Sequence, residues 1–394
     1  MSKQIKVVIG ANFGDEGKGL MTDYFCHELS KNGKVLNIRH NGGAQAGHTV
    51  VTPDGKRHVF SHFGSGSFVP HVATCLSKQF IVNPFLFCKE YVQLRDEFDL
   101  APMVYISKDC RVTTPYDMVI NQAAEEFRGE DRHGSCGVGI NETVERYKTP
   151  YGFSMSDYVE GDARQLLHRI RDEYVPGRLR DLGITHMTDE MKEWLNNEDV
   201  IDNWIFQFEY MVSYCKYVDV ADLLNDYDNI VLEGAQGLLL DNDYELFAPN
   251  LTSSKTGSHY PIELLEGIEG DVEVCYVTRS YFTRHGAGRF PSECMKNSIL
   301  PSEVVDKTNH TNQFQGQLRY GWFDYPLFIS AVQADMDVMW KAKPDAIRSF
   351  AVTHLDETCG IIRRPEGSMN PIGLPAFRHY LSYGETRETI HCQE

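Results

Sequence analysis

The sequence predicts an α/β protein with a large, mostly parallel central sheet and helices on both faces. Three observations support this fold class. Short apolar, β-branched segments typical of buried strands recur along the chain, and helical patterns separate them. A loop rich in glycine and polar residues follows each strand within a few residues. Alternating strands and helices favour a parallel sheet, because a crossover helix returns the chain to the same edge.

Five segments are predicted strands, and in chain order they are 6–9, 34–38, 229–232, 272–277 and 347–352. Helical patterns occupy segments between them, among them 20–30, 189–194 and 206–217. The loops that follow the strands are 10–19, 41–49, 233–237, 283–288 and 353–356. Ligands bind at the carboxyl ends of strands in open parallel sheets, so these loops are expected to converge on one site.

Length and composition indicate one continuous domain. The chain has 394 residues with 42% hydrophobic content, enough for a sizeable core. It contains no repeat, low-complexity tract or linker, so we expect a single domain over 1–394. The segment 155–225, rich in charged and aromatic residues, is expected to be a helical insertion or a dimer surface.

Charge and cysteine usage narrow the class of protein. A formal net charge of −18 argues against a nucleic-acid partner, although a small phosphate ligand is still compatible. The ten cysteines show no CxxC spacing, which is typical of reduced thiols in an intracellular protein. No signal peptide or membrane-spanning apolar run is evident, so we expect a cytoplasmic protein without a membrane partner.

The first loop lies between a strand and a helix, where backbone N–H groups and the helix N-terminus favour a phosphate. Lys18 would reach the terminal phosphates. The P-loop pattern is imperfect, because Asn12 replaces its first glycine and Gly19 replaces the Ser or Thr that binds magnesium. An ordinary glycine-rich turn is the alternative, but it would leave Asp15, Glu16 and Lys18 clustered without a packing reason.

Asp15 is the most informative carboxylate in this loop. A carboxylate beside phosphates is unfavourable unless it binds a cation or a proton, so Asp15 is a candidate Mg²⁺ ligand and general base. Stabilisation of a helix N-terminus by Asp15 is the alternative. His48 can donate a proton or stabilise developing negative charge, although a loop histidine is more often structural.

Two further side chains are suited to reading a nucleotide. Gln236 offers an amide for a purine edge or a phosphate, and its alternative role is to cap nearby backbone. Asp356 can accept two N–H donors from a guanine edge, and its alternative role is that of a turn former.

As a set, these motifs resemble the adenylosuccinate synthetase family over nearly the whole chain. The matching stretches are 14–19, 42–49, 134–139, 233–237, 252–254, 283–288, 321–324, 353–356 and 382–384. The resemblance implies a ligase that joins L-aspartate to C6 of a purine nucleoside monophosphate through a 6-phosphoryl intermediate. It implies that Asp15 removes the N1 proton, that Lys18 and His48 stabilise charge, and that aspartate then displaces phosphate.

The resemblance also implies binding residues. The donor, which is ATP, dATP or GTP, would contact Asn12, Gly14, Asp15, Glu16, Gly17, Lys18, Gly19, Thr49, His354, Asp356, Ser382 and Gly384. The purine monophosphate would contact Asp15, Gln45, Ala46, Gly47, His48, Ser135, Cys136, Arg146, Gln236 and Thr252. Aspartate would contact Gln313, Gln317 and Arg319, and Mg²⁺ would be bound by Asp15 and the carbonyl of Gly47. The family forms homodimers in which an arginine enters the partner's site, and Arg146 is the nearest candidate.

Three departures from the family pattern bear on the substrate. His354 replaces a lysine, which makes ATP or dATP plausible beside GTP, and Asn12-Phe13 replaces Gln-Trp. Only Arg319 remains of an arginine-rich loop that contacts aspartate and the substrate ribose. Loss of a ribose contact favours dGMP, as in the phage branch of the family that makes 2-aminoadenine DNA. Asp15 counts against that branch, where a smaller residue is common.

Two other readings compete with dGMP ligation. IMP with GTP is the alternative within the same family. A regulatory nucleotide-binding module or an inactive scaffold is an alternative of another class. The module leaves His48 and Gln236 unexplained, and the scaffold is disfavoured because Asp15, Lys18 and His48 are all present.

Overall fold

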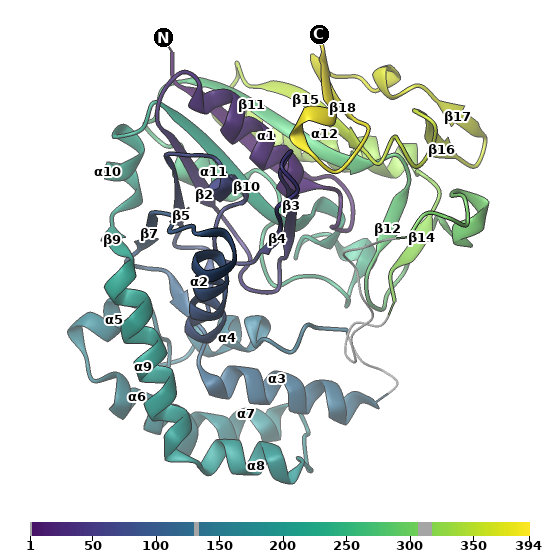
Figure 1. The fold of residues 1–394 in the computed structure, drawn as a ribbon. Helices are drawn as coiled ribbons and strands as arrows, with labels where there is room; N and C mark the ends of the chain where they lie inside the picture. The colour runs from purple at the N-terminus through teal and green to yellow at the C-terminus, as the bar shows by residue number, and fades with distance from the viewer. Residues whose placement is uncertain (1, 130–133, 306–316) are drawn as a thin grey trace.

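The computed structural model describes residues 2–129, 134–305 and 317–394 (Figure 1). A ten-stranded sheet has the order β19-β18-β15-β11-β1-β10-β2-β5-β7-β9. Its strands are β1 (Gln4–Gly10), β2 (Val35–Arg39), β5 (Val72–Leu76), β7 (Val104–Ser107), β9 (Lys216–Val218), β10 (Asn229–Gly237), β11 (Asp271–Arg279), β15 (Ile347–Thr353), β18 (Arg378–Ser382) and β19 (Ile390–Gln393). Every neighbouring pair is parallel except β18 and β19. The predicted fold class is confirmed.

The five predicted strands are β1, β2, β10, β11 and β15, and they are consecutive neighbours in the sheet, in the order β15-β11-β1-β10-β2. Because all five run parallel, their carboxyl ends lie along one edge. The five glycine-rich loops therefore start side by side although they are far apart in sequence.

Helices pack against both faces of the sheet. The described helices are α1 (Lys18–Ser30), α2 (Pro84–Phe98), α3 (Pro115–Arg128), α4 (Ile140–Tyr147), α5 (Met155–Glu160), α6 (Ala163–Arg169), α7 (Val175–Asp181), α8 (Asp189–Asn196), α9 (Glu198–Tyr214), α10 (Val220–Asn225), α11 (His259–Leu264) and α12 (Tyr325–Ala342), of which α1 and α12 lie on opposite faces. Successive β1 side chains point to opposite faces. Val7 accordingly packs in one core with Met336 of α12, and Val8 packs in another with Phe25 of α1.

Four small sheets accompany the main sheet in the described residues. They pair β3 (His48–Val51) with β4 (Arg57–Phe60), β6 (Ile81–Val82) with β8 (Arg111–Val112), β16 (Ile362–Arg364) with β17 (Gly367–Met369), and β14 (Arg319–Gly321) with both β12 (Phe282–Arg284) and β13 (Glu293–Cys294).

The segment 155–225 is largely helical and contributes to a third core together with α2 and α3. Figure 1 shows α5 to α9 gathered beside the main sheet. The predicted helix 206–217 is wrong at its end: α9 stops at Tyr214, and Lys216–Val218 pairs with β7 as the edge strand β9. Among the described helices, none is long and apolar enough to cross a membrane.

Candidate active site

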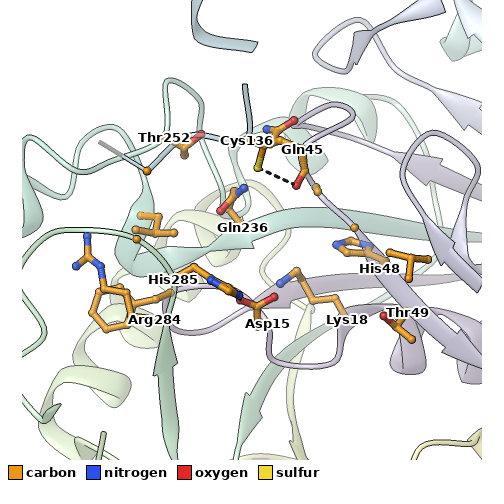
Figure 2. Close-up of a pocket in the computed structure, with 18 of the residues that line it drawn as sticks. Asp15, Lys18, Gln45, His48, Thr49, Cys136, Gln236, Thr252, Arg284 and His285 are labelled. Carbon is orange, nitrogen blue, oxygen red and sulfur yellow. Dashed lines mark hydrogen bonds and ion pairs between the residues drawn. The ribbon is translucent and has the colours of Figure 1, made fainter. Parts of the chain in front are cut away.

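A cavity of about 1110 Å³ opens at the carboxyl edge of the five central strands (Figure 2). All five glycine-rich loops contribute to its wall, as the spacing of motifs predicts. The predicted site residues that line it are Gly14, Asp15, Gly17, Lys18, Gly19, Gln45, Ala46, Gly47, His48, Thr49, Ser135, Cys136, Gln236, Thr252, His354, Asp356 and Gly384. Its volume is slightly above the roughly 300–1,000 Å³ of most small-molecule sites, which suits several substrates bound together.

The first loop is shaped by a buried carboxylate. Glu16 is 1% exposed, and its Oε1 accepts hydrogen bonds from the backbone N–H groups of Asn12 at 3.0 Å and Gly14 at 2.8 Å. Its Oε2 pairs with Lys18 Nζ at 2.6 Å. Gly17, with φ of 96°, provides the left-handed turn that starts α1, a conformation that glycine adopts without strain.

Two expected donor contacts in this loop are corrected by the structure. Asn12 is buried, and its amide donates to Thr278 Oγ1 at 2.7 Å rather than facing the cavity. Glu16 likewise faces the interior, because its carboxylate is needed by the loop's own N–H groups. Both residues fix the shape of the loop, and neither lines the cavity.

Asp15 extends into the cavity from a left-handed backbone position. Its φ is 62°, in the left-handed region that non-glycine residues adopt uncommonly. Arg279 Nε donates to the Asp15 carbonyl at 2.6 Å, and Arg279 Nη1 donates to the Tyr281 hydroxyl at 3.0 Å. The carboxylate Oδ2 lies 3.6 Å from Nε2 of His285. The backbone of Asp15 is thus fixed by the end of β11 while its carboxylate faces the site.

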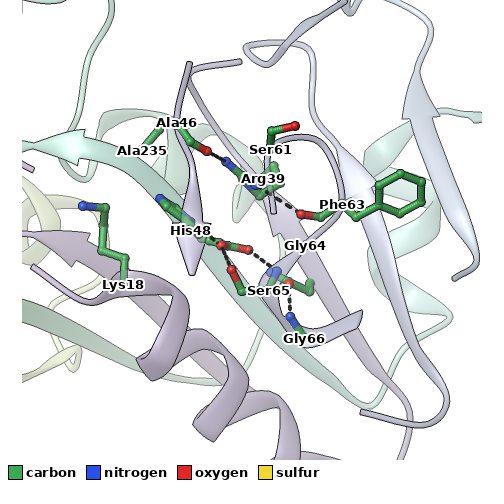
Figure 3. Close-up of polar contacts among 12 residues, drawn as sticks. Lys18, Arg39, Ala46, His48, Ser61, Phe63, Gly64, Ser65, Gly66 and Ala235 are labelled. Atoms are coloured by element: carbon green, nitrogen blue, oxygen red, sulfur yellow. Dashed lines mark hydrogen bonds and ion pairs between the residues drawn. The ribbon is translucent and has the colours of Figure 1, made fainter. Parts of the chain in front are cut away.

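His48 is held by an ionised carboxylate (Figure 3). Its Nδ1 lies 2.5 Å from Glu233 Oε1, and Ser65 donates to the same carboxylate through its backbone N–H at 3.0 Å and its hydroxyl. Although burial opposes its ionisation, Arg39 and the hydrogen bonds from His48 and Ser65 lower the pKa of Glu233 to about 2. Burial and the charge of Arg39 lower the pKa of His48 to about 4, against the opposing effect of Glu233.

The free site therefore contains a neutral imidazole beside a carboxylate. The Nδ1–H of His48 donates to Glu233, which fixes the ring and leaves Nε2 for a ligand. Negative charge arriving in the cavity favours the protonated ring, so His48 can become a hydrogen-bond donor when phosphate binds.

Several functional residues were missed by sequence reasoning. Glu233 opens a motif that the sequence singles out, but nothing in the motif pairs it with His48. His285 lies in the fourth loop and Arg279 lies shortly before it, and the loop's sequence signal comes from its glycines and not from these two side chains. Arg39 and Ser65 lie outside every motif, so no sequence signal could have found them.

The side chains expected around the purine gather on one wall, where Gln45, Cys136, Gln236 and Thr252 are drawn together in Figure 2. Cys136 contacts the Gln45 carbonyl at 4.0 Å. Burial and the charge of Asp15 raise the pKa of the Cys136 thiol to about 11, so it offers a neutral thiol.

Arg146 does not reach this wall. It is fully buried, with Nε and Nη2 each 2.8 Å from the carboxylate of Asp117. Its guanidinium also donates to the carbonyls of Tyr151 and Val112 at 2.8 Å. This corrects its expected roles in purine binding and in crossing to a partner subunit, because an arginine locked in the interior can do neither.

Of the residues expected around the base of the donor nucleotide, some line the cavity and one does not. His354, Asp356 and Gly384 line the cavity, whereas Ser382 is 1% exposed and donates to the Gly384 carbonyl at 2.9 Å. The Ser382 side chain thus shapes its turn. Thr353 Oγ1 donates to the Glu16 carbonyl at 2.7 Å, which ties this region to the first loop.

The expected aspartate-binding residues are absent from the cavity wall as far as the structure describes them. Gln313 lies outside the described residues, and Gln317 is exposed. Arg319 donates to the carbonyls of Gly286 at 3.2 Å and Gly288 at 2.9 Å. It also pairs with Glu293 through Nε at 2.8 Å and through Nη2. Arg319 therefore holds the backbone of the fourth loop and does not line the cavity.

The donor set suits a magnesium ion that is completed by substrate. The described residues contain no cluster of three or more His, Cys, Asp or Glu side chains that could hold a metal alone. Magnesium commonly uses one or two carboxylates together with substrate phosphates and water. Asp15 and Gly47 both line the cavity with Lys18, and a carboxylate and a carbonyl there would supply oxygen ligands that fit that pattern.

Comparisons with known proteins agree with this architecture. The family model for adenylosuccinate synthetase matches residues 7–354. The adenylosuccinate synthetase of Gloeothece citriformis is 30% identical over 360 residues, covering 89% of this chain and 73% of the relative. The solved, fully ligated adenylosuccinate synthetase from Plasmodium falciparum has a TM-score of 0.73 at 16% identity, covering 99% of this chain and 100% of that one.

A second solved structure is the succinoaminodeoxyadenylate synthetase PurZ of cyanophage S-2L, bound to dGMP and dATP as an energy donor. It has a TM-score of 0.58 at 16% identity, covering 99% of this chain and 95% of that one. At such identities the two structures establish a shared fold, while the family match extends over most of the chain. This chain belongs to the adenylosuccinate synthetase family of carbon–nitrogen ligases.

Proposed function

We propose that this ligase joins L-aspartate to C6 of dGMP, giving 2-amino-2′-deoxyadenylosuccinate, with a purine nucleoside triphosphate as energy donor. The observation that carries the sugar preference is the position of Arg319. Its guanidinium is engaged by Glu293 and by the carbonyls of Gly286 and Gly288, outside the cavity wall. A substrate without a 2′-hydroxyl needs no contact from this arginine.

The cavity side chains supply the chemistry of the first step. Asp15 takes the N1 proton of the 6-oxopurine, which makes the 6-oxygen a nucleophile for the terminal phosphate of the donor. Lys18 and the N–H groups of the first loop neutralise charge on that phosphate. His48, protonated once the phosphates are bound, donates to the developing oxyanion while Glu233 stabilises its positive charge. Magnesium, when bound, neutralises charge on the phosphate oxygens.

The second step exploits the phosphorylated oxygen as a leaving group. The amine of aspartate attacks C6 and gives up one proton to the departing phosphate, the C6–O bond breaks, and inorganic phosphate leaves with the former 6-oxygen. His48 and Lys18 remain beside the departing phosphate, so the same positive charge serves both steps. Guanine and hypoxanthine present the same N1–H and 6-oxygen, so the chemistry does not distinguish them.

One solved neighbour supports the dGMP reading, because the phage enzyme with this fold binds dGMP and dATP. His354 lines the cavity where the family carries a lysine, which supports ATP or dATP as donor beside GTP. The second candidate is IMP with GTP, and it is favoured by Asp15, which the cavity retains.

The deciding experiment is aspartate-dependent phosphate release with Mg²⁺, crossing dGMP, GMP and IMP with ATP, dATP and GTP. We expect kcat/KM to be highest with dGMP and to fall with GMP. A higher value with IMP than with dGMP would overturn the proposed substrate. Phosphate release that does not require aspartate would overturn ligation itself.

A further inference from the structure

We infer that His285 selects the substituent at C2 of the purine by accepting a hydrogen bond from the 2-amino group of guanine. The inference rests on the proposed function only in that Asp15 meets N1 of the base. It adds a specificity-determining residue at a position outside the binding residues expected from the sequence.

The backbone of His285 lies between two anchored neighbours. On one side, Arg284 is 1% exposed and donates to the carbonyls of Arg289 at 2.5 Å and Asn250 at 3.0 Å. On the other side, the Gly286 carbonyl accepts from Arg319 at 3.2 Å. The backbone at His285 is therefore fixed on both sides, and its ring lines the cavity.

The position of His285 relative to Asp15 defines which edge of the purine it meets. Its Nε2 lies 3.6 Å from Asp15 Oδ2, so the two side chains face the same part of the cavity. The Asp15 backbone is itself clamped by Arg279, so both groups are pre-positioned before a ligand binds.

In a 6-oxopurine, N1 is bonded to C6 on one side and to C2 on the other. Figure 2 draws Asp15 between His285 and Lys18. If the 6-oxygen faces Lys18 and His48, as phosphoryl transfer requires, C2 lies on the His285 side of Asp15. The substituent at C2 then enters the space beside Asp15 Oδ2 and His285 Nε2.

The chemistry of that space favours an amino group over hydrogen. An exocyclic amine carries two N–H bonds, and the Asp15 carboxylate can accept one of them together with N1–H. An imidazole nitrogen that carries no hydrogen can accept the other. Hypoxanthine offers only C–H at C2, which leaves His285 without this bond, and sites built around such a bond discriminate against analogues that lack it.

The test compares dGMP with dIMP, which share the sugar and differ only at C2. In His285→Ala we expect the ratio of kcat/KM for dGMP to that for dIMP to fall about tenfold. His285→Gln places an amide oxygen of similar reach at the position, so it should recover much of the ratio. His354→Ala, from the same cavity wall, should change both rates alike and leave the ratio near the wild-type value.

Two results would overturn the assignment. One is an unchanged dGMP-to-dIMP ratio in His285→Ala, and the other is an effect confined to the KM for aspartate. Calorimetric affinities for dGMP and dIMP in the absence of donor supply the same ratio without turnover. Failure of the proposed function would show separately, as a wild-type protein that prefers IMP to dGMP. The change in the dGMP-to-dIMP ratio caused by His285→Ala can be measured whichever substrate the wild type prefers.

Discussion

His48 and Glu233 form a buried pair in which the imidazole Nδ1 lies 2.5 Å from the carboxylate Oε1. The pair joins two strands that are separated by nearly two hundred residues in the chain, since Glu233 belongs to β10 and His48 opens β3. Its consequence is that the ring presents one defined nitrogen to the site and can be charged when phosphate arrives.

Glu233→Gln is expected to lower kcat by about a hundredfold, because the amide no longer stabilises a protonated His48. KM should change much less, since Glu233 does not line the cavity. Steady-state kinetics with saturating donor and aspartate measure both values. Ser65→Ala is the matched control, because it removes a hydrogen bond to the same carboxylate without removing its charge, and its effect should be smaller. Equal losses of kcat in the two variants would contradict the proposed role of the charge.

The free energy of unfolding is expected to fall on acidification from pH 6.5. His48 has an ordinary pKa of 6.5 and a folded pKa of about 4. Between these two pH values its imidazole is protonated in the unfolded chain and neutral in the folded chain, so acid favours unfolding. Glu233 contributes stability that is present above its ordinary pKa of 4.5 and is lost as pH falls toward about 2. Both effects destabilise the fold in acid.

Urea unfolding at several pH values measures this dependence. In His48→Gln the free energy of unfolding should depend less steeply on pH between 6.5 and 4 than in wild type. The difference corresponds to about one proton, since glutamine does not titrate. Parallel profiles for the two proteins would refute the lowered pKa of His48.

Asp15→Asn is expected to reduce aspartate-dependent phosphate release by about a thousandfold, because asparagine cannot accept the N1 proton. The fold should persist, since Arg279 holds the backbone carbonyl of Asp15 and asparagine tolerates the left-handed φ of 62°. Product formation and thermal melting are measured on the same preparation. Substantial turnover by a well-folded Asp15→Asn protein would exclude Asp15 as the base.

Arg319→Ala is expected to lower kcat/KM for dGMP and GMP by the same factor, several-fold in each case. The arginine braces the loop that carries His285 and is not directed at the sugar, so its loss loosens the loop for both substrates. Glu293→Gln, which removes the charge that pairs with Arg319, should have a weaker effect in the same direction. A selective loss of GMP activity would instead indicate a contact between Arg319 and the 2′-hydroxyl.

Arg146→Met is expected to lower the free energy of unfolding by about 3–5 kcal/mol, because it leaves the buried Asp117 carboxylate without its cation. Arg164→Met, at an exposed pair with Asp202, is the control and should lower the free energy of unfolding far less, because solvent screens that pair. Denaturant titration measures both, and sedimentation measures the oligomeric state. A dimer that dissociates in Arg146→Met without loss of stability would restore Arg146 as an interface residue.

Local sequence determined the five central strands of the sheet and the place of the site. Apolar β-branched segments became β1, β2, β10, β11 and β15, because such segments gain most from burial between two layers of helices. Glycine-rich loops marked the strand ends, since only they allow backbone N–H groups to approach a ligand closely. The family resemblance, read from those loops, located most of the cavity wall.

Only the tertiary structure decided which way individual side chains point. Glu16 and Lys18 carry the same sequence signal, yet Glu16 turns inward to bind its own loop and Lys18 lines the cavity. Arg146 is drawn into the interior by Asp117, and His48 is oriented by Glu233. The physical reason is that a charged side chain goes where its partner lies, and the partners of Arg146 and His48 come from other helices and strands that no local pattern specifies.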